Sequence, residues 1–376
     1  MHIGILGAGQ LGRMLALAGY PLANRFSLLD PAGTPSADIG RIMTGQDDDT
    51  LAEFLAGVDL VTYEFEHLDT ALVERIEAHV PVYPSRRALA VCQNRGDEKA
   101  LFSHLSIPTP EWRLVGSATE LAEAVNAMGA PVVAKSVTEG YDGKGQAVLH
   151  HADEAEAAWN SIGHTQLVVE AFVDFVREMS IIAVRSTSGE LAFYPMAENH
   201  HHQGILRYSM APLADISDDV QARAEHYIQQ LLDELDYVGV LALELFQLAD
   251  GSLLVNEMAP RVHNSGHWTM DGAVTSQFEN HLRAIQGLPL GSTRALHPTC
   301  MINIIGREVD ASEILAHEDV HLHRYGKSER AGRKLGHLNV TAPTPDELKA
   351  RLAEVHPLVP DVPAPRFLAW ESSREA

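Results

Sequence analysis

The stretch LALELFQLADGSLLVNEMAP, residues 241–260, contains two apolar runs on either side of Asp250 and Gly251. This dipeptide favours a tight two-residue turn between antiparallel strands, so the stretch predicts a β-hairpin. With those two residues in the turn, paired residues are those whose numbers add up to 501. In that register Glu244 faces Glu257 across the hairpin.

Two directly opposed side chains in such a hairpin lie about 5 Å apart. Two carboxylates at that separation repel each other unless a cation lies between them or they share a proton. The alternating apolar neighbours indicate that the pair is partly sheltered. Carboxylate oxygens with Asn256 beside them suit Mg²⁺, carried in by a nucleoside triphosphate, better than zinc. The alternative is an exposed hairpin face that carries two acids.

A second segment, AKSVTEGYDGKGQ (residues 134–146), combines a lysine with a glycine-rich loop. Lys135 ends an apolar run, and three glycines loosen the loop around Lys144. Backbone N–H groups and lysine charges with little side-chain bulk can cover a polyphosphate. The segment lacks the G-K-[ST] of a Walker loop, and a solvated flexible hairpin is the alternative.

The first residues, MHIGILGAGQLGRM, contain GAGQLG at 7–12, which fits the pattern G-x-G-x-x-G. Residues 2–6 predict a buried strand and residues 11–17 a helix, so the glycines join a strand to a helix N-terminus that favours an anion. Asp30 ends the next apolar run, at the distance expected for a nicotinamide dinucleotide site. A dinucleotide-dependent oxidoreductase is therefore one hypothesis, although this motif alone is weak evidence.

The chain has 376 residues, 45% of them hydrophobic, which is enough for two or three globular domains. No stretch approaches a membrane-spanning helix, and the first strand begins next to Met1, so we expect a cytoplasmic protein. The two cysteines, Cys92 and Cys300, form neither a disulfide framework nor a C-x-x-C metal motif. The net charge of −23 disfavours nucleic acid and anionic membranes as partners.

An anionic substrate of so acidic a chain needs a local basic pocket. One candidate is RYGKSERAGRKLG (residues 324–336), in which five basic residues lie within eleven positions. They are Arg324, Lys327, Arg330, Arg333 and Lys334. Interspersed glycines keep the segment irregular, so we interpret it as an anion-binding loop; a solvated surface loop is the alternative.

The order of apolar runs predicts an open α/β sheet at the start of the chain and a mixed, strand-rich region after it. The expected elements of the first part are strands 2–6, 26–30, 60–65 and 80–83 with helices 11–18, 50–55 and 70–78. Glu64 and Glu66 in TYEFEH lie at the end of a strand and share a face if that strand persists. Later helices are expected at 218–235 and 346–355.

Lys135, the GYDGKGQ loop, VVEAFVDFVREMS and the hairpin glutamates, in this order, resemble the ATP-grasp superfamily. More closely, six motifs resemble the 5-(carboxyamino)imidazole ribonucleotide synthase family of purine biosynthesis, over essentially the whole chain. These motifs are GAGQLGRM, EFEHL, GYDGKGQ, ENHHHQGILR, NEMAPRVHNSGHWT and YGKSERAGRKLGHLNV. The resemblance implies an α/β and α+β chain with a pre-ATP-grasp domain at 1–97, an ATP-grasp domain at 98–290 and a small C-terminal domain at 291–376.

The resemblance implies that ATP and Mg²⁺ are the cofactors, with Glu244 and Glu257 as the metal ligands. Glu178 would accept hydrogen bonds from the ribose hydroxyls. The implied ATP contacts are Arg95, Lys135, Gly140, Tyr141, Asp142, Gly143, Lys144, Gly145, Gln146, Glu170, Ala171, Phe172, Val173, Glu178, His201, Asn256 and Glu257. The run of histidines at 200–202 does not suggest zinc, because successive residues on a strand point to opposite faces.

The other implied substrates are aminoimidazole ribonucleotide and bicarbonate, joined through carboxyphosphate with release of ADP and phosphate. The implied substrate contacts are Gln10, Leu11, Glu64, His263, Asn264, Lys327 and Arg333, and the implied catalytic residues are Tyr141, Asp142, Arg261, His263 and Asn264. Arg261 could clamp a planar bicarbonate or carboxyphosphate. His263 and Asp142 are the candidates for proton transfer. The resemblance also implies a homodimer.

Three alternatives remain open at this point. A formate-dependent glycinamide ribonucleotide transformylase shares the ATP apparatus, but that family lacks the Tyr-Asp of the loop and has Asp where this chain has Asn264. A nicotinamide oxidoreductase would leave Lys135 and the paired glutamates unexplained. A non-catalytic ATP-binding regulator would not need every expected polar position.

Overall fold

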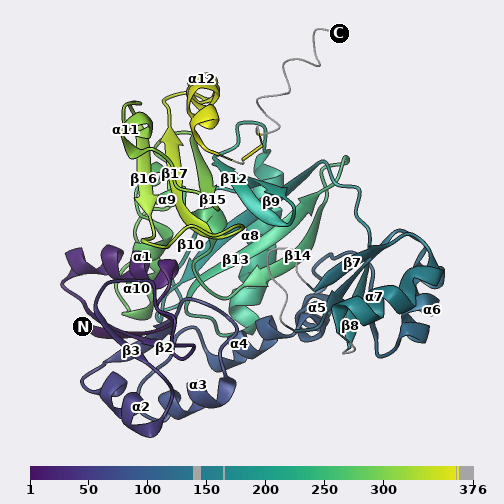
Figure 1. Cartoon of the computed structure of the whole chain (residues 1–376), viewed down its shortest axis with the longest axis horizontal. Helices are drawn as coiled ribbons and strands as arrows, with labels where there is room; N and C mark the ends of the chain where they lie inside the picture. The colour runs from purple at the N-terminus through teal and green to yellow at the C-terminus, as the bar shows by residue number, and fades with distance from the viewer. Residues whose placement is uncertain (139–144, 164–165, 361, 364–376) are drawn as a thin grey trace.

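The computed structural model describes residues 1–138, 145–163, 166–360 and 362–363. Figure 1 shows three β-sheets in this part of the chain, one for the first strands, one small sheet set apart at one side, and one large central sheet. The predicted residues Gly140, Tyr141, Asp142, Gly143 and Lys144 lie outside the described ranges. The α/β and α+β fold class predicted from the sequence is confirmed.

The first sheet is parallel, with the order β3-β2-β1-β4. Its strands are β1 (His2–Leu6), β2 (Arg25–Asp30), β3 (Arg41–Thr44) and β4 (Leu60–Tyr63). The predicted strand at 80–83 is wrong, because only the isolated bridge between Val61 and Val82 forms there. The predicted strand at 60–65 ends at Tyr63, so Glu64 and Glu66 lie just beyond it, and the condition under which they would share a face is not met.

Short helices lie between these strands or follow the last of them, and polar side chains cap several of these helices. The helices are α1 (Gln10–Gly19), α2 (Asp48–Leu55), α3 (Thr70–Glu77), α4 (Arg86–Gln93) and α5 (Arg95–His104). Asp47, Asp69 and Ser85 each accept a hydrogen bond from a free N–H in the first turn, which fixes where α2, α3 and α4 begin. Asn94 does the same for α5.

The small sheet is antiparallel, with the order β5-β8-β6-β7. Its strands are β5 (Trp112–Val115), β6 (Val132–Ser136), β7 (Gln146–Leu149) and β8 (Leu167–Ala171). The helices α6 (Ala118–Met128) and α7 (Ala155–Ile162) cover one face (Figure 1), and Leu121 and Val125 pack there against Leu149. The opposite face of β6 and β8 carries Lys135 and Glu170 toward the rest of the molecule.

The large sheet has the order β14-β13-β9-β11-β12-β15-β17-β16, with β10 paired to β9. Its strands are β9 (Arg177–Arg185), β10 (Leu191–Phe193), β11 (Ala197–His202), β12 (Ile205–Ala211), β13 (Gly239–Gln247), β14 (Leu253–Ala259), β15 (Thr299–Ile305), β16 (Val320–Arg324) and β17 (Lys334–Thr341). All its neighbouring strands run antiparallel.

Helices cover both faces of this sheet. They are α8 (Asp218–Glu234), α9 (Thr269–Gly272), α10 (Gln277–Ile285), α11 (Ala311–Ile314) and α12 (Pro345–Val355). Alternate side chains of β13 point to opposite cores: Leu241 and Leu243 pack with α8, whereas Val240 and Ala242 pack with α1 and α10. The helices predicted at 218–235 and 346–355 are confirmed as α8 and α12.

The strands of the last quarter of the chain extend the large sheet rather than forming one of their own. Tyr208 on β12 pairs with Ile302 on β15, so hydrogen bonding continues across the predicted boundary at residue 290. Figure 1 shows β15, β16 and β17 beside β12, with α11 and α12 at the same end. No helix among the described residues combines the length and apolar character needed to cross a membrane.

Candidate active site

The hairpin of β13 and β14 pairs Glu244 directly with Glu257, as the sequence predicts. A β-bulge follows this pair, and Asn256 is the extra residue that has no partner in the ladder. Beyond the bulge the register is one residue out of step, with Leu245 opposite Val255. The predicted pairing of the two carboxylates is therefore confirmed, but the uniform register is wrong.

The turn of this hairpin explains why Glu244 still faces Glu257 although the register is not uniform. The backbone N–H of Leu248 donates to Ser252 O at 2.9 Å, so three residues form the loop instead of two. Gly251 lies in the left-handed region, with φ of 80°, which suits such a loop. The longer turn shifts the register by one residue, and the bulge at Asn256 shifts it back.

The paired carboxylates are sheltered and electrostatically strained. The Glu244 side chain is 16% exposed. Burial, followed by the charge of Glu257, raises the pKa of Glu244 to about 7. Such a pair suits Mg²⁺, which usually takes one or two carboxylates together with substrate phosphates. The described residues include no group of three or more acidic, histidine or cysteine side chains placed to hold a metal ion.

His263 lies beside this pair, with Nε2 3.2 Å from Glu244 Oε1. Ser265 N–H points at Nδ1 from 3.3 Å, which places the ring proton on Nε2. Burial, followed by the charge of Arg261, lowers the pKa of His263 to about 3. The ring is therefore neutral near pH 7, and in this state Nε2 can donate to Glu244 while Nδ1 accepts from Ser265.

Arg261 forms a bidentate ion pair with Glu66. Its Nη2 donates to Oε1 at 2.9 Å, and its Nε donates to Oε2. Burial alone raises the pKa of Glu66, but the charge and hydrogen bonds of Arg261 outweigh it and lower that pKa to about 2. The edge of the guanidinium that was predicted to clamp bicarbonate thus holds Glu66 here.

Glu64 lies in the glycine turn at the start of α1. Its carboxylate accepts from Gly12 N at 2.5 Å and from Gly9 N. A Cβ added to Gly9 would stand 2.8 Å from Glu64 Oε1, so the glycine is needed for this approach. The amides that would bind a dinucleotide phosphate hold a carboxylate of the chain itself, and this explains the glycine pattern without a nicotinamide cofactor.

A buried cluster of charges joins the small sheet to the hairpin. Glu170 forms ion pairs with Lys135 through Oε2 and with Lys99 through Oε1. Burial raises the pKa of Glu170, but the charges of Lys135 and Lys99 outweigh it and lower that pKa to about 2. Lys99 Nζ also donates to Asn256 O at 2.7 Å, and Lys135 Nζ to Asn256 Oδ1 at 3.3 Å.

Sequence analysis missed Lys99 and the acceptor roles of Glu66 and Glu98. Glu98 is buried and accepts from Met258 N at 2.7 Å, and burial raises its pKa to about 8. A signal for Lys99 exists, because it lies three residues before the buried Phe102 and therefore on the inner face of α5. A lysine on such a face needs a partner.

Glu178 and His201 contact each other across β9 and β11, where Glu178 Oε2 meets His201 Nδ1. Burial lowers the pKa of His201, but the hydrogen bond and charge of Glu178 outweigh it and raise that pKa. His200 turns instead to Glu198, 2.7 Å away, and His202 is exposed. Neighbouring histidines of this run therefore contact different carboxylates.

One large cavity, of about 1210 Å³, brings most of these groups together. Residues from all three parts of the chain line it. Those among the predicted site residues are Gln10, Leu11, Glu64, Arg95, His201, Glu244, Glu257, Arg261, His263, Asn264, Lys327 and Arg333. The predicted ATP contacts on the described part of the small sheet are not among its lining residues, but Lys135 contacts Asn256, the neighbour in sequence of the lining residue Glu257.

The basic loop between β16 and β17 forms one wall of this cavity. Lys327, Arg330, Arg333 and Lys334 line it, and Lys327 Nζ donates to Gln10 Oε1. Arg324 does not line it, because its guanidinium lies 3.2 Å from Glu308. Four of the five predicted basic residues therefore face the site.

The remaining predicted residues have defined places. Arg95 Nη1 donates to Ser136 O at 3.0 Å, and Asn264 and Asn303 exchange amide hydrogen bonds at 3.1 and 2.7 Å. Gly145 and Gln146 lie at the start of β7. Phe172 is half exposed, just beyond the end of β8, in the segment that was predicted to frame the adenine.

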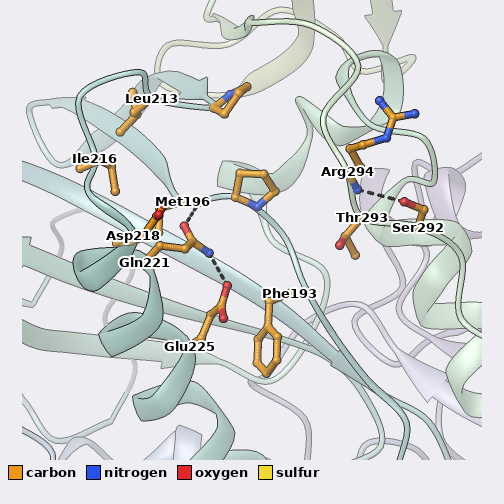
Figure 2. Close-up of a pocket in the computed structure, with 12 residues that line it drawn as sticks. Phe193, Met196, Leu213, Ile216, Asp218, Gln221, Glu225, Ser292, Thr293 and Arg294 are labelled. Atoms are coloured by element: carbon orange, nitrogen blue, oxygen red, sulfur yellow. Dashed lines mark hydrogen bonds between the residues drawn. The ribbon is translucent and has the colours of Figure 1, made fainter.

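A second, smaller cavity of about 440 Å³ lies elsewhere, between α8 and the segment before β15 (Figure 2). None of the predicted site residues that the structure describes lines it. Figure 2 shows Gln221 engaged through both groups of its amide, which accepts from Met196 N and donates to Glu225. The predicted residues line the larger cavity instead, which is therefore the candidate active site.

A small antiparallel sheet and a large sheet that together present a lysine and paired carboxylates are typical of ATP-grasp enzymes. Three family models match in agreement with this. Residues 100–278 match the ATP-grasp domain, residues 1–93 the ribonucleotide synthetase preATP-grasp domain, and residues 299–351 the phosphoribosylaminoimidazole carboxylase C-terminal domain. The fold and site thus define an ATP-grasp ligase.

Known relatives indicate which family of ATP-grasp ligases this chain resembles. N5-carboxyaminoimidazole ribonucleotide synthase of Pseudomonas aeruginosa is 46% identical over 362 residues, which covers 96% of this chain and 99% of the relative. The Thermus thermophilus synthetase structure has a TM-score of 0.91 at 47% identity, with 96% and 99% of the two chains covered. An Aspergillus clavatus synthase structure, in complex with ADP and 5-aminoimidazole ribonucleotide, has a TM-score of 0.87 at 31% identity, with 95% and 98% covered.

The chain belongs to the N5-carboxyaminoimidazole ribonucleotide synthase family of ATP-dependent ligases. The resemblance predicted from the sequence is thereby confirmed. The oxidoreductase and transformylase alternatives are wrong for this chain.

Proposed function

We propose that this chain carboxylates the exocyclic amine of 5-aminoimidazole ribonucleotide with ATP and bicarbonate, and releases ADP and phosphate, as a step of purine biosynthesis. The observation that most supports this reaction is the cavity of about 1210 Å³ that joins the Glu244–Glu257 pair to the basic loop. One end suits a metal-bound triphosphate and the other suits a sugar phosphate.

In the ATP half, Glu244 and Glu257 would hold Mg²⁺, which supplies positive charge to the phosphates when bound. Lys135 and Arg95 would contact the phosphates. Glu178 would accept from the ribose hydroxyls once His201 turns to the nucleotide, because an ionised carboxylate is an acceptor only. Residues 170–173 would frame the adenine, and the loop of Gly140, Tyr141, Asp142, Gly143, Lys144, Gly145 and Gln146 would cover the phosphates.

In the substrate half, Lys327 and Arg333 would bind the ribose phosphate, with Gln10 and Leu11 beside it. Glu64, His263 and Asn264 would contact the rest of the substrate. Arg261 would exchange Glu66 for bicarbonate, whose planar shape matches the same guanidinium edge. Because Arg261 is what keeps the pKa of the buried Glu66 low, the exchange would require another donor to take its place beside Glu66.

The chemistry follows from these positions. An oxygen of bicarbonate attacks the γ-phosphorus of ATP, ADP leaves, and carboxyphosphate forms. Carboxyphosphate breaks down to carbon dioxide and phosphate, and the amine attacks the carbon dioxide while it loses one proton. Asp142 and His263 are the candidates for holding or moving that proton. A closed cavity protects the labile intermediate and product from water.

Oxygen transfer tests the carboxyphosphate step. Turnover with Mg-ATP, aminoimidazole ribonucleotide and ¹⁸O-labelled bicarbonate should give phosphate that carries one ¹⁸O from bicarbonate, because the attacking oxygen stays on phosphorus. Mass spectrometry of the released phosphate measures this. Unlabelled phosphate under conditions without oxygen exchange would contradict the step while leaving carboxylation itself possible.

We also propose roles for the three domains, an oligomeric state and a cellular location. Residues 1–97 and 291–376 would bind the phosphoribosyl substrate from two sides, and residues 98–290 would bind ATP. The protein would act as a cytoplasmic homodimer on small molecules, without nucleic acid or membrane partners. Sedimentation of the purified chain at two concentrations tests the homodimer, and a single species of monomer mass would contradict it.

A further inference from the structure

Lys99 is a buried lysine to which the reaction described above gives no role. Its side chain is 2% exposed, and it contacts the Glu170 carboxylate and the Asn256 carbonyl. Lys135, on the other side of the same carboxylate, is 16% exposed. Two ammonium groups thus share one buried carboxylate, and Lys135 is the more accessible of the two.

This arrangement poses a problem for nucleotide binding. Lys135 must leave Glu170, at least in part, if its ammonium is to reach a phosphate. The Glu170 side chain is only 4% exposed, so water cannot replace a lost partner easily. Leaving a buried carboxylate without a compensating charge is strongly unfavourable.

We infer that Lys99 is a positioning residue that keeps the buried Glu170 carboxylate compensated, so that Lys135 can turn to the nucleotide phosphates. The inference rests on the proposed ATP contact of Lys135. Before ATP arrives, the cluster of Lys99, Lys135 and Glu170 carries one net positive charge. Once Lys135 binds phosphate, Lys99 and Glu170 remain behind as a neutral pair.

The backbone fixes Lys99 in this place. Lys99 projects from α5, Glu170 from β8 and Lys135 from β6, so the cluster joins the small sheet to the preceding helix. The bulge takes Asn256 out of the β13–β14 ladder, and the carbonyl of Asn256 accepts from Lys99 at 2.7 Å. The same lysine therefore also holds the strand that carries the proposed metal ligand Glu257.

A double-mutant cycle tests the inference, with the dissociation constant of Mg-ATP measured by calorimetry on the whole chain. Lys99→Met should raise this constant about tenfold or more, which corresponds to about 1.4 kcal/mol per factor of ten. Adding Glu170→Gln to Lys99→Met should restore most of the affinity, because no buried charge then holds Lys135. Lys99→Arg, which keeps the charge, should lie closer to the wild type than Lys99→Met.

A second readout separates positioning from mere packing. In the Lys99→Met variant the KM for ATP should rise, while the KM for aminoimidazole ribonucleotide, bound at the other end of the cavity, should change little. A packing defect would affect both, and Glu170→Gln would not repair it. Equal Mg-ATP affinity of Lys99→Met and the wild type, or no gain from adding Glu170→Gln, overturns the inference.

If the Lys99→Met single variant does not fold, the comparison between Glu170→Gln and the double variant still tests the inference. In the Glu170→Gln background, adding Lys99→Met should leave the Mg-ATP constant unchanged within about threefold, since the charge that needs compensation is gone. A further loss of tenfold in that background contradicts the inference. Failure of the proposed Lys135 contact looks different, because Lys135→Met would then leave the Mg-ATP constant unchanged. Failure of the proposed carboxylation would leave Mg-ATP binding and the results of this cycle as they are.

Discussion

Buried carboxylates dominate the site at the residue scale, and the partner of each one sets its behaviour. Glu66 faces an arginine and Glu170 faces two lysines, so both have a pKa of about 2 and stay charged. Glu244 is buried and faces another carboxylate, which raises its pKa to about 7, so a cation between the two would stabilise the charged form. Glu64 caps backbone amides, which only partly offset the rise that burial causes in its pKa. One residue type thus serves four different purposes.

Removal of one carboxylate of the hairpin pair tests the metal assignment. Glu257→Gln should lower ADP formation by about a hundredfold or more, because a metal ion stabilises phosphoryl transfer by several kcal/mol. Steady-state ADP release at saturating Mg-ATP measures this. Glu225→Gln is the matched control, since Glu225 lines only the second cavity. Near-normal turnover of Glu257→Gln would refute the assignment.

Loss of the Glu64 carboxylate should weaken the glycine turn. Glu64→Ala leaves the N–H groups of Gly9 and Gly12 without their acceptor, which should lower the free energy of unfolding by about 1–3 kcal/mol. Urea denaturation measures the change. Glu53→Ala, which removes an exposed carboxylate paired with Arg41, should change stability by less than about 0.5 kcal/mol. Equal stability of both variants would show that water replaces the carboxylate freely.

The hairpin shows at the element scale how a correct pairing can follow from an incorrect turn. The apolar alternation and Asp250-Gly251 were enough to predict two strands and the facing glutamates. The sequence carries no clear sign of the bulge at Asn256 or of the three-residue loop, because both depend on contacts with β9 and α5. The two deviations cancel at Glu244 and Glu257, the proposed metal ligands.

Helix α10 connects the first sheet to the large sheet through one buried histidine. His281 Nδ1 accepts from Val240 N at 3.1 Å, which leaves the proton on Nε2, 2.8 Å from Thr62 Oγ1. Burial lowers the pKa of His281 to about 3. A charged ring could not accept from Val240, so this contact requires the neutral form.

The His281 contact predicts a pH dependence of stability. The folded pKa lies below the value of about 6.5 in an unfolded chain, so the unfolded state takes up more protons as the pH falls. The stability from this group is present above pH 6.5 and is lost as the pH falls toward 3. Between about pH 7.5 and about pH 5.5 the wild type should therefore lose about 1 kcal/mol more than His281→Asn.

Urea denaturation at the two pH values measures this difference. His79→Asn, at an exposed position, should lose as much stability as the wild type over the same interval. A His281→Asn variant with the wild-type pH dependence would contradict the proposed role of the neutral ring.

Charge is the dominant feature at the scale of the whole molecule. A chain with a net charge of −23 gathers Lys327, Arg330, Arg333 and Lys334 on one wall of one cavity. The large sheet makes this possible, because β16 and β17 bring the loop to the edge of the first sheet, where Lys327 meets Gln10. A phosphate-bearing substrate would therefore meet a local positive potential on a molecule whose net charge repels it.

The basic loop supplies its own matched control. Arg333→Gln should raise the KM for aminoimidazole ribonucleotide about tenfold, because a charge-assisted hydrogen bond contributes about 1.5–3 kcal/mol. Arg324→Gln, in the same loop but paired with Glu308, should change that KM less than about twofold. Initial rates over a range of substrate concentrations measure both. An equal effect of the two variants would favour general electrostatics over a defined phosphate contact.

The sequence predicted local features well and long-range contacts poorly. The strands, the hairpin pair, the basic loop and the family followed from motifs that each lie within a few residues. Contacts such as Glu64 with Gly9, Glu66 with Arg261 and Lys99 with Asn256 join residues 55 to 195 positions apart. No periodicity encodes them, and they arise only when the three sheets pack together.

ADP release is the measurement that tests the central claim most directly. The purified chain is incubated with Mg-ATP and aminoimidazole ribonucleotide, with and without bicarbonate, beside a parallel reaction with glycinamide ribonucleotide and formate. The account predicts ADP release that bicarbonate stimulates in the first reaction and no turnover in the second. Turnover only with glycinamide ribonucleotide and formate would contradict the account, although the fold and the Glu244–Glu257 pair would stand.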